Sequence, residues 1–125
     1  MQRLAYARTI AVIDDEEMVR TSMSSLIRST GLNARTFPSA DAFLASGETQ
    51  FACLISDVQM PGTSGLELQE IISRWDERPP MIIMSGHHQG MREAAMQGGA
   101  ACYIDKPIDG ELLISCLEEL LGSLP

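Results

Sequence analysis

The sequence is short of positive charge and of long apolar runs, and each shortage excludes a class of protein. Nine Lys and Arg residues stand against 17 Asp and Glu residues, which gives a formal net charge of −8. Such a surface repels phosphate groups, so direct binding of nucleic acid or of an anionic membrane is not expected. The first apolar run, Ile10 to Ile13, is too short for a signal peptide or a membrane span.

Cysteine is scarce as well. The chain has three cysteines, Cys53, Cys102 and Cys116, an odd number without metal-type spacing. We therefore expect buried thiols in a reducing cytoplasm rather than disulfides. Apolar residues are abundant, at 45% of 125 residues. That is enough for one domain with a single core that needs no disulfide or metal to fold.

The sequence does contain a regular alternation of short β-type runs with stretches that carry apolar residues at helical spacing. The predicted strands are 9–14, 33–37, 52–56, 81–84 and 100–104. The predicted helices are 18–30, 40–46, 65–75, 91–96 and a last one whose apolar stripe runs from Leu113 to Leu121. Ser64 and Glu67 form a capping box at the start of the third helix. Alternation at this scale predicts an α/β fold, a doubly wound parallel sheet with helices on both faces.

The residues that end the predicted strands carry the candidate chemistry. Ligands of such sheets bind at the carboxyl ends of strands, where Asp14, Asp15, Asp57, Ser85 and Lys106 are expected to converge. Three carboxylates repel one another unless cations join them, and a lysine and Mg²⁺ would do so. An aspartate beside Mg²⁺, an ammonium and a hydroxyl has the groups that phosphoryl transfer needs. Asp57 is therefore interpreted as a phosphoryl acceptor.

Four motifs in this order resemble a response-regulator receiver domain of two-component signalling: IDDEE, SDVQMPGTSGLEL, MSGH and YIDKP. The chain is similar to receivers that precede LuxR-type DNA-binding output domains. The resemblance covers essentially the whole chain, so the expectation is one receiver domain over 1–125 with no output domain present. It implies a flavodoxin-like (βα)5 fold with a five-stranded parallel sheet in the order 2-1-3-4-5.

The resemblance also implies roles for individual site residues. Asp57 would be the phosphoacceptor, and Asp15 would bind Mg²⁺ directly. Asp14 would act largely through a metal-bound water, and the backbone carbonyl of Gln59 would complete the protein ligands. Lys106 would bind a phosphoryl oxygen, and its bond to the following proline is expected to be cis. The domain would catalyse only its own phosphorylation and slow dephosphorylation, so it is not expected to be an enzyme in the ordinary sense.

Ser85 and Tyr103 are expected to carry the signal. The Ser85 hydroxyl would bind a phosphoryl oxygen, and the Tyr103 ring would follow it inward from the outer edge of its strand. In the family this changes the surface formed by the fourth helix, the fifth strand and the fifth helix. The implied partners are a histidine kinase in a phosphorelay, an output domain or partner protein acting in transcription, and a second copy in a phosphorylation-dependent homodimer.

Three other interpretations fit parts of the pattern. An aspartyl-phosphate phosphohydrolase normally has a second acid two residues after the nucleophile, where this chain has Gln59. A flavodoxin-like FMN carrier shares the architecture, but the acidic loop 14–17 would repel a phosphate that lacks a metal. A pseudo-receiver that never takes phosphate would not need the full set of site residues. The His87-His88 pair is interpreted as a loop, because adjacent side chains diverge and no third ligand accompanies them.

Overall fold

Strands and helices alternate along the chain as the sequence predicts. The computed structural model describes residues 8–86, 90–122 and 124, and the His87-His88 pair lies outside them. The elements are β1 (Thr9–Ile13), α2 (Glu17–Ser29), β2 (Asn33–Phe37), α3 (Ala40–Ala45), β3 (Cys53–Asp57), α4 (Gly65–Ile72), β4 (Met81–Ser85), α5 (Met91–Gln97), β5 (Cys102–Asp105) and α6 (Gly110–Leu121). Among the described helices, none has the length and apolar character needed to cross a membrane.

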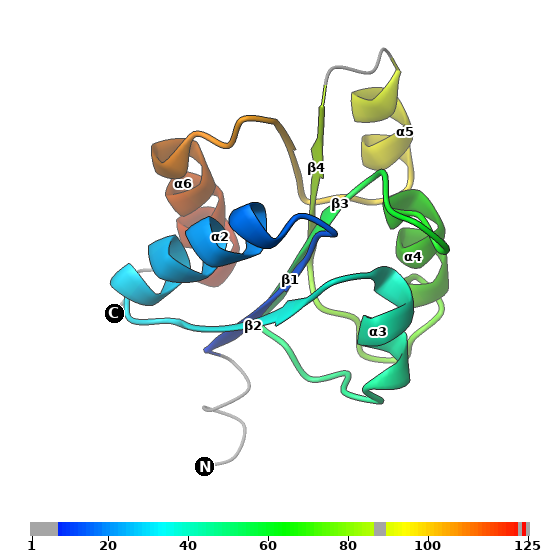
Figure 1. The fold of residues 1–125 in the computed structure, drawn as a ribbon, viewed down its shortest axis with the longest axis horizontal. Coiled ribbons are helices and arrows are strands. Elements are labelled where there is room, and N and C mark those ends of the chain that lie inside the picture. The colour runs from blue at the N-terminus through cyan, green and yellow to red at the C-terminus, as the bar shows by residue number, and fades with distance from the viewer. Residues whose placement is uncertain (1–7, 87–89, 123, 125) are drawn as a thin grey trace.

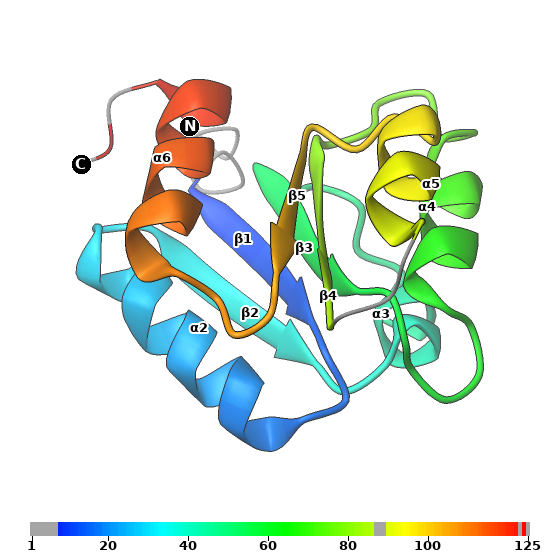
Figure 2. The same cartoon turned by 90° about the horizontal axis from the view of Figure 1, so that it is seen from above.

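The five strands form one parallel sheet in the order β2-β1-β3-β4-β5, as expected for a flavodoxin-like fold. Helices α2 and α6 cover one face, and α3, α4 and α5 cover the other (Figure 1). Figure 2 shows the same two helical layers from above, with the sheet between them. Every residue of β3 and β4 is buried, which is why these runs lack polar alternation. The strand order reverses between β1 and β3, so a crevice is expected at their carboxyl ends.

Capping side chains set where the helices begin. Ser39 Oγ accepts a hydrogen bond from the Ala42 amide at the start of α3. The predicted capping box of Ser64 and Glu67 is present at the start of α4, with both of its hydrogen bonds formed. Asp109 accepts hydrogen bonds from two backbone amides, which sets the start of α6 at Gly110. Each cap satisfies amides that would otherwise lack partners.

The predicted fifth strand begins later than expected. The backbone of Gly99 has a φ of +100°, and the amides of Gly99 and Ala100 donate to carbonyls of Met96 and Ala95. These two bonds close α5 in a Schellman motif. The chain therefore enters the sheet only at Cys102, because the preceding residues complete the helix cap.

The apolar residues form one cluster on each face of the sheet. The cluster under α3, α4 and α5 contains three phenylalanines, and the rings of Phe37 and Phe43 meet edge to face with centroids 5.2 Å apart. The other cluster contains two of the cysteines, Cys53 and Cys116, as buried free thiols. Cys102 is half-buried and also free. Burial raises the pKa of Cys53 and of Cys102 to about 12, so both thiols stay protonated at neutral pH.

Candidate functional site

The carboxyl ends of three strands bring together three of the predicted site residues. The register pairs Ile13 with Ser56, so Asp14, the residue after β1, lies beside Asp57, the last residue of β3. Lys106 Nζ, from the end of β5, lies 2.9 Å from Asp14 Oδ2 and 3.0 Å from Asp57 Oδ2. One ammonium thus bridges two carboxylates that lie on neighbouring strands.

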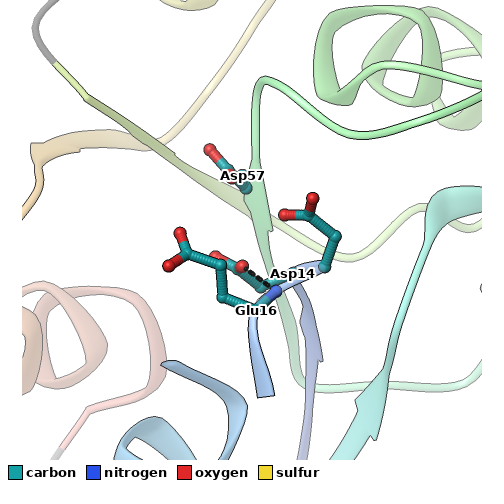
Figure 3. Close-up of side chains that lie close together, drawn as sticks. Asp14, Glu16 and Asp57 are labelled. Carbon is teal, nitrogen blue, oxygen red and sulfur yellow. Dashed lines mark hydrogen bonds between the residues drawn. The ribbon is translucent and has the colours of Figure 1, made fainter. Parts of the chain in front are cut away.

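Two further carboxylates complete an acidic cluster. Asp14, Asp15, Glu16 and Asp57 each offer an oxygen, and these oxygens lie within 4.8 Å of one another. Asp14 and Asp57 are buried, whereas Asp15 and Glu16 are exposed. Figure 3 shows Asp57 at the end of its strand beside the loop that carries Asp14 and Glu16. Glu16, whose carboxylate lies 3.4 Å from Lys106 Nζ, was not among the predicted site residues. The sequence signal that could have indicated Glu16 is its place in the run DDEE, directly after Asp14 and Asp15.

The electrostatics of the cluster are unbalanced. Burial raises the pKa of Asp57 above its ordinary value, and the Asp14 charge adds to the rise, while Lys106 acts in the opposite direction without cancelling it. Burial acts to lower the pKa of Lys106, but the Asp14 and Asp57 carboxylates outweigh it, so the net direction is upward and the amine stays charged. Four carboxylates share one ammonium, which leaves an excess of negative charge at the end of the sheet.

The donor set fits a hard divalent cation such as Mg²⁺. All four side chains offer carboxylate oxygens, the ligands that Mg²⁺ and Ca²⁺ prefer. The fully buried Asp14 Oδ2 lies at ion-pair distance from Lys106 but accepts no well-aligned hydrogen bond, so it retains unused acceptor capacity. An open hollow of about 530 Å³ lies over the cluster, and Gln59, Gly86 and Lys106 are among the residues that line it. Gln59, whose carbonyl the resemblance makes a ligand, is thus one of the residues at the hollow.

The loop after Asp57 is tightly folded against the strand end. The Gly65 amide donates to the Val58 carbonyl at 2.8 Å, which closes the loop where α4 begins. A Cβ atom at position 65 would lie 2.1 Å from the Asp57 carbonyl oxygen, so only glycine permits this approach. Thr63 Oγ1 donates to Asp41 Oδ1 at 2.7 Å, which ties the loop to α3. The segment that carries Gln59 is thus anchored at both ends.

Ser85 ends β4 with a buried and unpaired hydroxyl. Ser85 is 1% exposed, and its Oγ has no hydrogen-bond partner among the described residues. The register pairs Asp57 with Met84, so Ser85 follows directly on the strand beside Asp57. A buried hydroxyl without a partner is uncommon in folded proteins and calls for a specific explanation. A ligand that supplies an acceptor oxygen at this end of the sheet would provide one.

Tyr103 does not lie where the sequence interpretation placed it. The expectation of a ring at the outer edge of its strand is wrong for this structure, because Tyr103 is 7% exposed and belongs to the cluster under α3, α4 and α5. The guanidinium of Arg92 lies over the ring, 5.1 Å from its centroid, and covers it from α5.

The expected cis bond between Lys106 and Pro107 is confirmed.

Comparison with known proteins places this geometry in a family. Residues 10–118 match the family described as response regulator receiver domain. The chain is 38% identical over 118 residues to the response regulator protein TmoT of Ectopseudomonas mendocina, covering 93% of this chain and 54% of that protein. It is 37% identical over 115 residues to the transcriptional regulatory protein FixJ of Azorhizobium caulinodans, covering 90% and 54%. The chain therefore spans about half the length of the curated relatives it matches.

Solved structures show the same similarity in three dimensions. The crystal structure of FixJ-N superposes with a TM-score of 0.81 at 32% sequence identity, over 94% of this chain and 95% of that one. The response regulator StyR superposes with a TM-score of 0.82 at 34% identity, over 90% of this chain and 58% of that one. The fold is therefore shared with response regulators.

Proposed function

This chain belongs to the response regulator receiver family, and from that premise we propose that Asp57 accepts a phosphoryl group from a histidine kinase in the presence of Mg²⁺. The observation that carries the proposal is the position of Lys106 Nζ, 3.0 Å from Asp57 Oδ2 and 2.9 Å from Asp14 Oδ2 beneath an open hollow. The domain, taken as residues 1–125, would act in signalling rather than on an outside substrate.

In the proposed transfer, an Asp57 oxygen forms a bond to phosphorus while the P–N bond of the kinase phosphohistidine breaks and the imidazole takes up a proton. Burial keeps the Asp57 carboxylate poorly solvated, and Lys106 holds its Oδ2 in place. Once Asp57 is phosphorylated the charge of its carboxylate is lost, so the ammonium of Lys106 becomes available to a phosphoryl oxygen.

Mg²⁺ would be held by Asp15, Asp57 and the Gln59 carbonyl, with Asp14 acting largely through a bound water. Bound there, the ion would neutralise the carboxylates and the phosphoryl oxygens. The exposure of Asp15 and the burial of Asp14 support this division of roles. An exposed carboxylate can turn toward an incoming ion, whereas Asp14 is already committed to Lys106 and to the Glu16 amide.

Ser85 would report the phosphoryl group to the rest of the domain. Its unpaired hydroxyl gains a charge-assisted hydrogen bond when a phosphoryl oxygen arrives, a contribution of about 1.5–3 kcal/mol. Such a contribution shifts a two-state population by about ten- to a hundredfold. Because the Tyr103 ring is already buried under Arg92, the change would pass through the chain after Ser85 into α5. Tyr103 would respond by repacking rather than by entering from outside.

The fourth helix, the fifth strand and the fifth helix are α5, β5 and α6 in this structure, and the surface they form would meet the partner. Two large apolar side chains on it are exposed, Met96 of α5 at 43% and Leu112 of α6 at 47%. Such residues support binding of an output domain of the LuxR type, of a separate partner protein, or of a second copy in a phosphorylated homodimer. Membership of the receiver family is consistent with a cytoplasmic protein, and the acidic charge of the chain argues against binding of nucleic acid or membrane through this domain.

The proposal is tested with acetyl phosphate and Mg²⁺. The wild-type chain should gain one phosphoryl group that is labile to base and to hydroxylamine, as acyl phosphates are. Asp57→Asn should gain none, because an amide is a poor nucleophile. The matched control is Asp105→Asn, which removes an exposed carboxylate next to Lys106 and should still be labelled.

A label retained on Asp57→Asn, or none on the wild type, would overturn the assignment of the phosphoacceptor. Steady turnover of small phosphate esters would instead favour the phosphohydrolase interpretation. Turnover of such esters is not expected, since Gln59 occupies the position where phosphohydrolases of that class carry their second acid.

A further inference from the structure

The acidic loop after β1 is held through every polar group of Asp14. Its amide donates to the Phe37 carbonyl at 3.1 Å, and its Oδ1 accepts from the Glu16 amide at 2.8 Å. Its Oδ2 lies 2.9 Å from Lys106 Nζ. The fourth group, the backbone carbonyl, accepts a hydrogen bond of 2.8 Å from Arg20 Nη1. Arg20 belongs to α2 and to none of the strand ends, so the sequence pattern did not point to it.

The bond from Arg20 is directed at a peptide group rather than at a carboxylate. Arg20 is the fourth residue of α2, and its side chain reaches back past the start of the helix to the Asp14 carbonyl. Among the ion pairs of the described residues, none involves the Arg20 guanidinium. The charge of Arg20 therefore strengthens a hydrogen bond to the backbone instead of pairing with an acid.

The peptide group that Arg20 holds is the one that joins Asp14 to Asp15. Since a peptide group is planar, fixing its carbonyl fixes the direction in which the Asp15 Cα leaves Asp14. Asp15 and Glu16 are exposed, and their charges repel those of Asp14 and Asp57. Without a constraint on this peptide, rotation about its neighbouring bonds would carry the Asp15 carboxylate away from the cluster.

We infer that Arg20 is a positioning residue for the cation site: by holding the Asp14 carbonyl, it keeps the Asp15 carboxylate beside Asp57 while no metal is bound. The inference rests on the proposed function, in which Asp15 binds Mg²⁺ directly. Arg20 would contact neither the ion nor the phosphoryl group. It lowers the reorganisation that cation binding would otherwise require.

The sign of the effect on Mg²⁺ affinity separates this role from a purely electrostatic one. Removing a positive charge near a cation site strengthens cation binding, because a repulsion is lost. Removing a group that holds a ligand in place weakens it, typically by tenfold or more for partners of metal ligands. We therefore expect Arg20→Gln to bind Mg²⁺ about tenfold more weakly than the wild type.

Arg28 provides a matched control on the same helix. Its Nη2 donates to the Ala34 carbonyl at 3.3 Å, far along α2 from the acidic loop. Arg28→Gln changes the net charge by the same amount and also removes a bond from arginine to a backbone carbonyl. It should leave Mg²⁺ affinity near the wild-type value. Arg20→Lys, which keeps the charge and one donor, should recover part of the affinity lost in Arg20→Gln.

Two measurements test the inference. Calorimetric titration with Mg²⁺ compares the affinities of the wild type, Arg20→Gln, Arg20→Lys and Arg28→Gln. Amide hydrogen exchange in EDTA then follows the Glu16 amide, which donates to Asp14 Oδ1, in the absence of any metal. Exchange at this amide should be faster in Arg20→Gln than in Arg28→Gln, because the turn that protects it is released.

An affinity in Arg20→Gln equal to or above that of Arg28→Gln would overturn the inference, as would unchanged exchange of the Glu16 amide. A wild-type chain that binds no Mg²⁺ would instead refute the proposed function. The metal-free exchange distinguishes the two failures, since it tests the hold of Arg20 on the loop directly.

Discussion

Replacing Asp57 by asparagine should make the protein more stable when no divalent cation is present. Lys106 Nζ lies 3.0 Å from Asp57 Oδ2, an attraction of about 5–6 kcal/mol at an effective dielectric constant of about 20. The buried Asp14 carboxylate lies within 4.8 Å, a repulsion of about 3–4 kcal/mol on the same scale. The exposed Asp15 and Glu16 add smaller repulsions, since water screens them. These opposing contributions largely cancel.

The cost that remains is the burial of the Asp57 charge, which is also the largest cause of its raised pKa. An asparagine keeps the shape of the side chain and one acceptor oxygen but carries no charge. Lys106 would still pair with Asp14 and Glu16 in this variant. We therefore expect Asp57→Asn to raise the free energy of unfolding at neutral pH by about 1–3 kcal/mol in EDTA.

The stability gain of Asp57→Asn should depend on pH in a defined direction, whereas a gain from packing alone would not change with pH. Since the pKa of Asp57 is raised in the folded protein, the folded state keeps this proton to a higher pH than the unfolded chain. The corresponding stability is complete below the unfolded value of about 3.9 and is lost as pH rises through the folded value. The gain of Asp57→Asn over the wild type should therefore grow with pH across this window and then stay constant.

Urea unfolding in EDTA at several pH values measures this gain, with Asp105→Asn as the control for loss of an exposed carboxylate. The slopes of the two transitions should agree, so that a shift in midpoint reports stability alone. Added Mg²⁺ should narrow the gap, because it stabilises the wild type more. A variant less stable than the wild type at neutral pH, or a gain that does not change with pH, would refute the reasoning.

Three further predictions concern other residues of the site. Asp15→Asn should gain less thermal stability from Mg²⁺ than the wild type, and equal gains in melting temperature would count against Asp15 as a ligand. Ser85→Ala should unfold at no lower urea concentration than the wild type, because it removes a buried hydroxyl without a partner. It should still be phosphorylated by acetyl phosphate, but its amide shifts over residues 90–106 should respond weakly to beryllofluoride; a wild-type response would show that Ser85 does not carry the signal. Gly65→Ala should lose about 2 kcal/mol or more, since its Cβ would lie 2.1 Å from the Asp57 carbonyl oxygen; a wild-type urea midpoint would contradict the close approach described for the loop.

Local signals in the sequence were sufficient for the elements and for the strand-end residues. Uninterrupted apolar runs marked β3 and β4, because strands buried on both faces need no polar alternation. The capping box at Ser64 marked the start of α4, because its hydrogen bonds join residues three positions apart. Asp14, Asp57 and Lys106 could be grouped in advance, because the carboxyl ends of parallel strands meet at one edge of the sheet.

Tertiary structure alone decided contacts that depend on how each helix lies on the sheet. Burial of the Tyr103 ring depends on α5 bringing Arg92 over it, and a strand pattern does not say which helix covers which residue. The bond from Arg20 to the Asp14 carbonyl depends on the angle at which α2 leaves the acidic loop. That angle is set by the packing of α2 on the sheet. The sequence determined which groups reach the end of the sheet, and packing between segments distant in the chain decided which way they point.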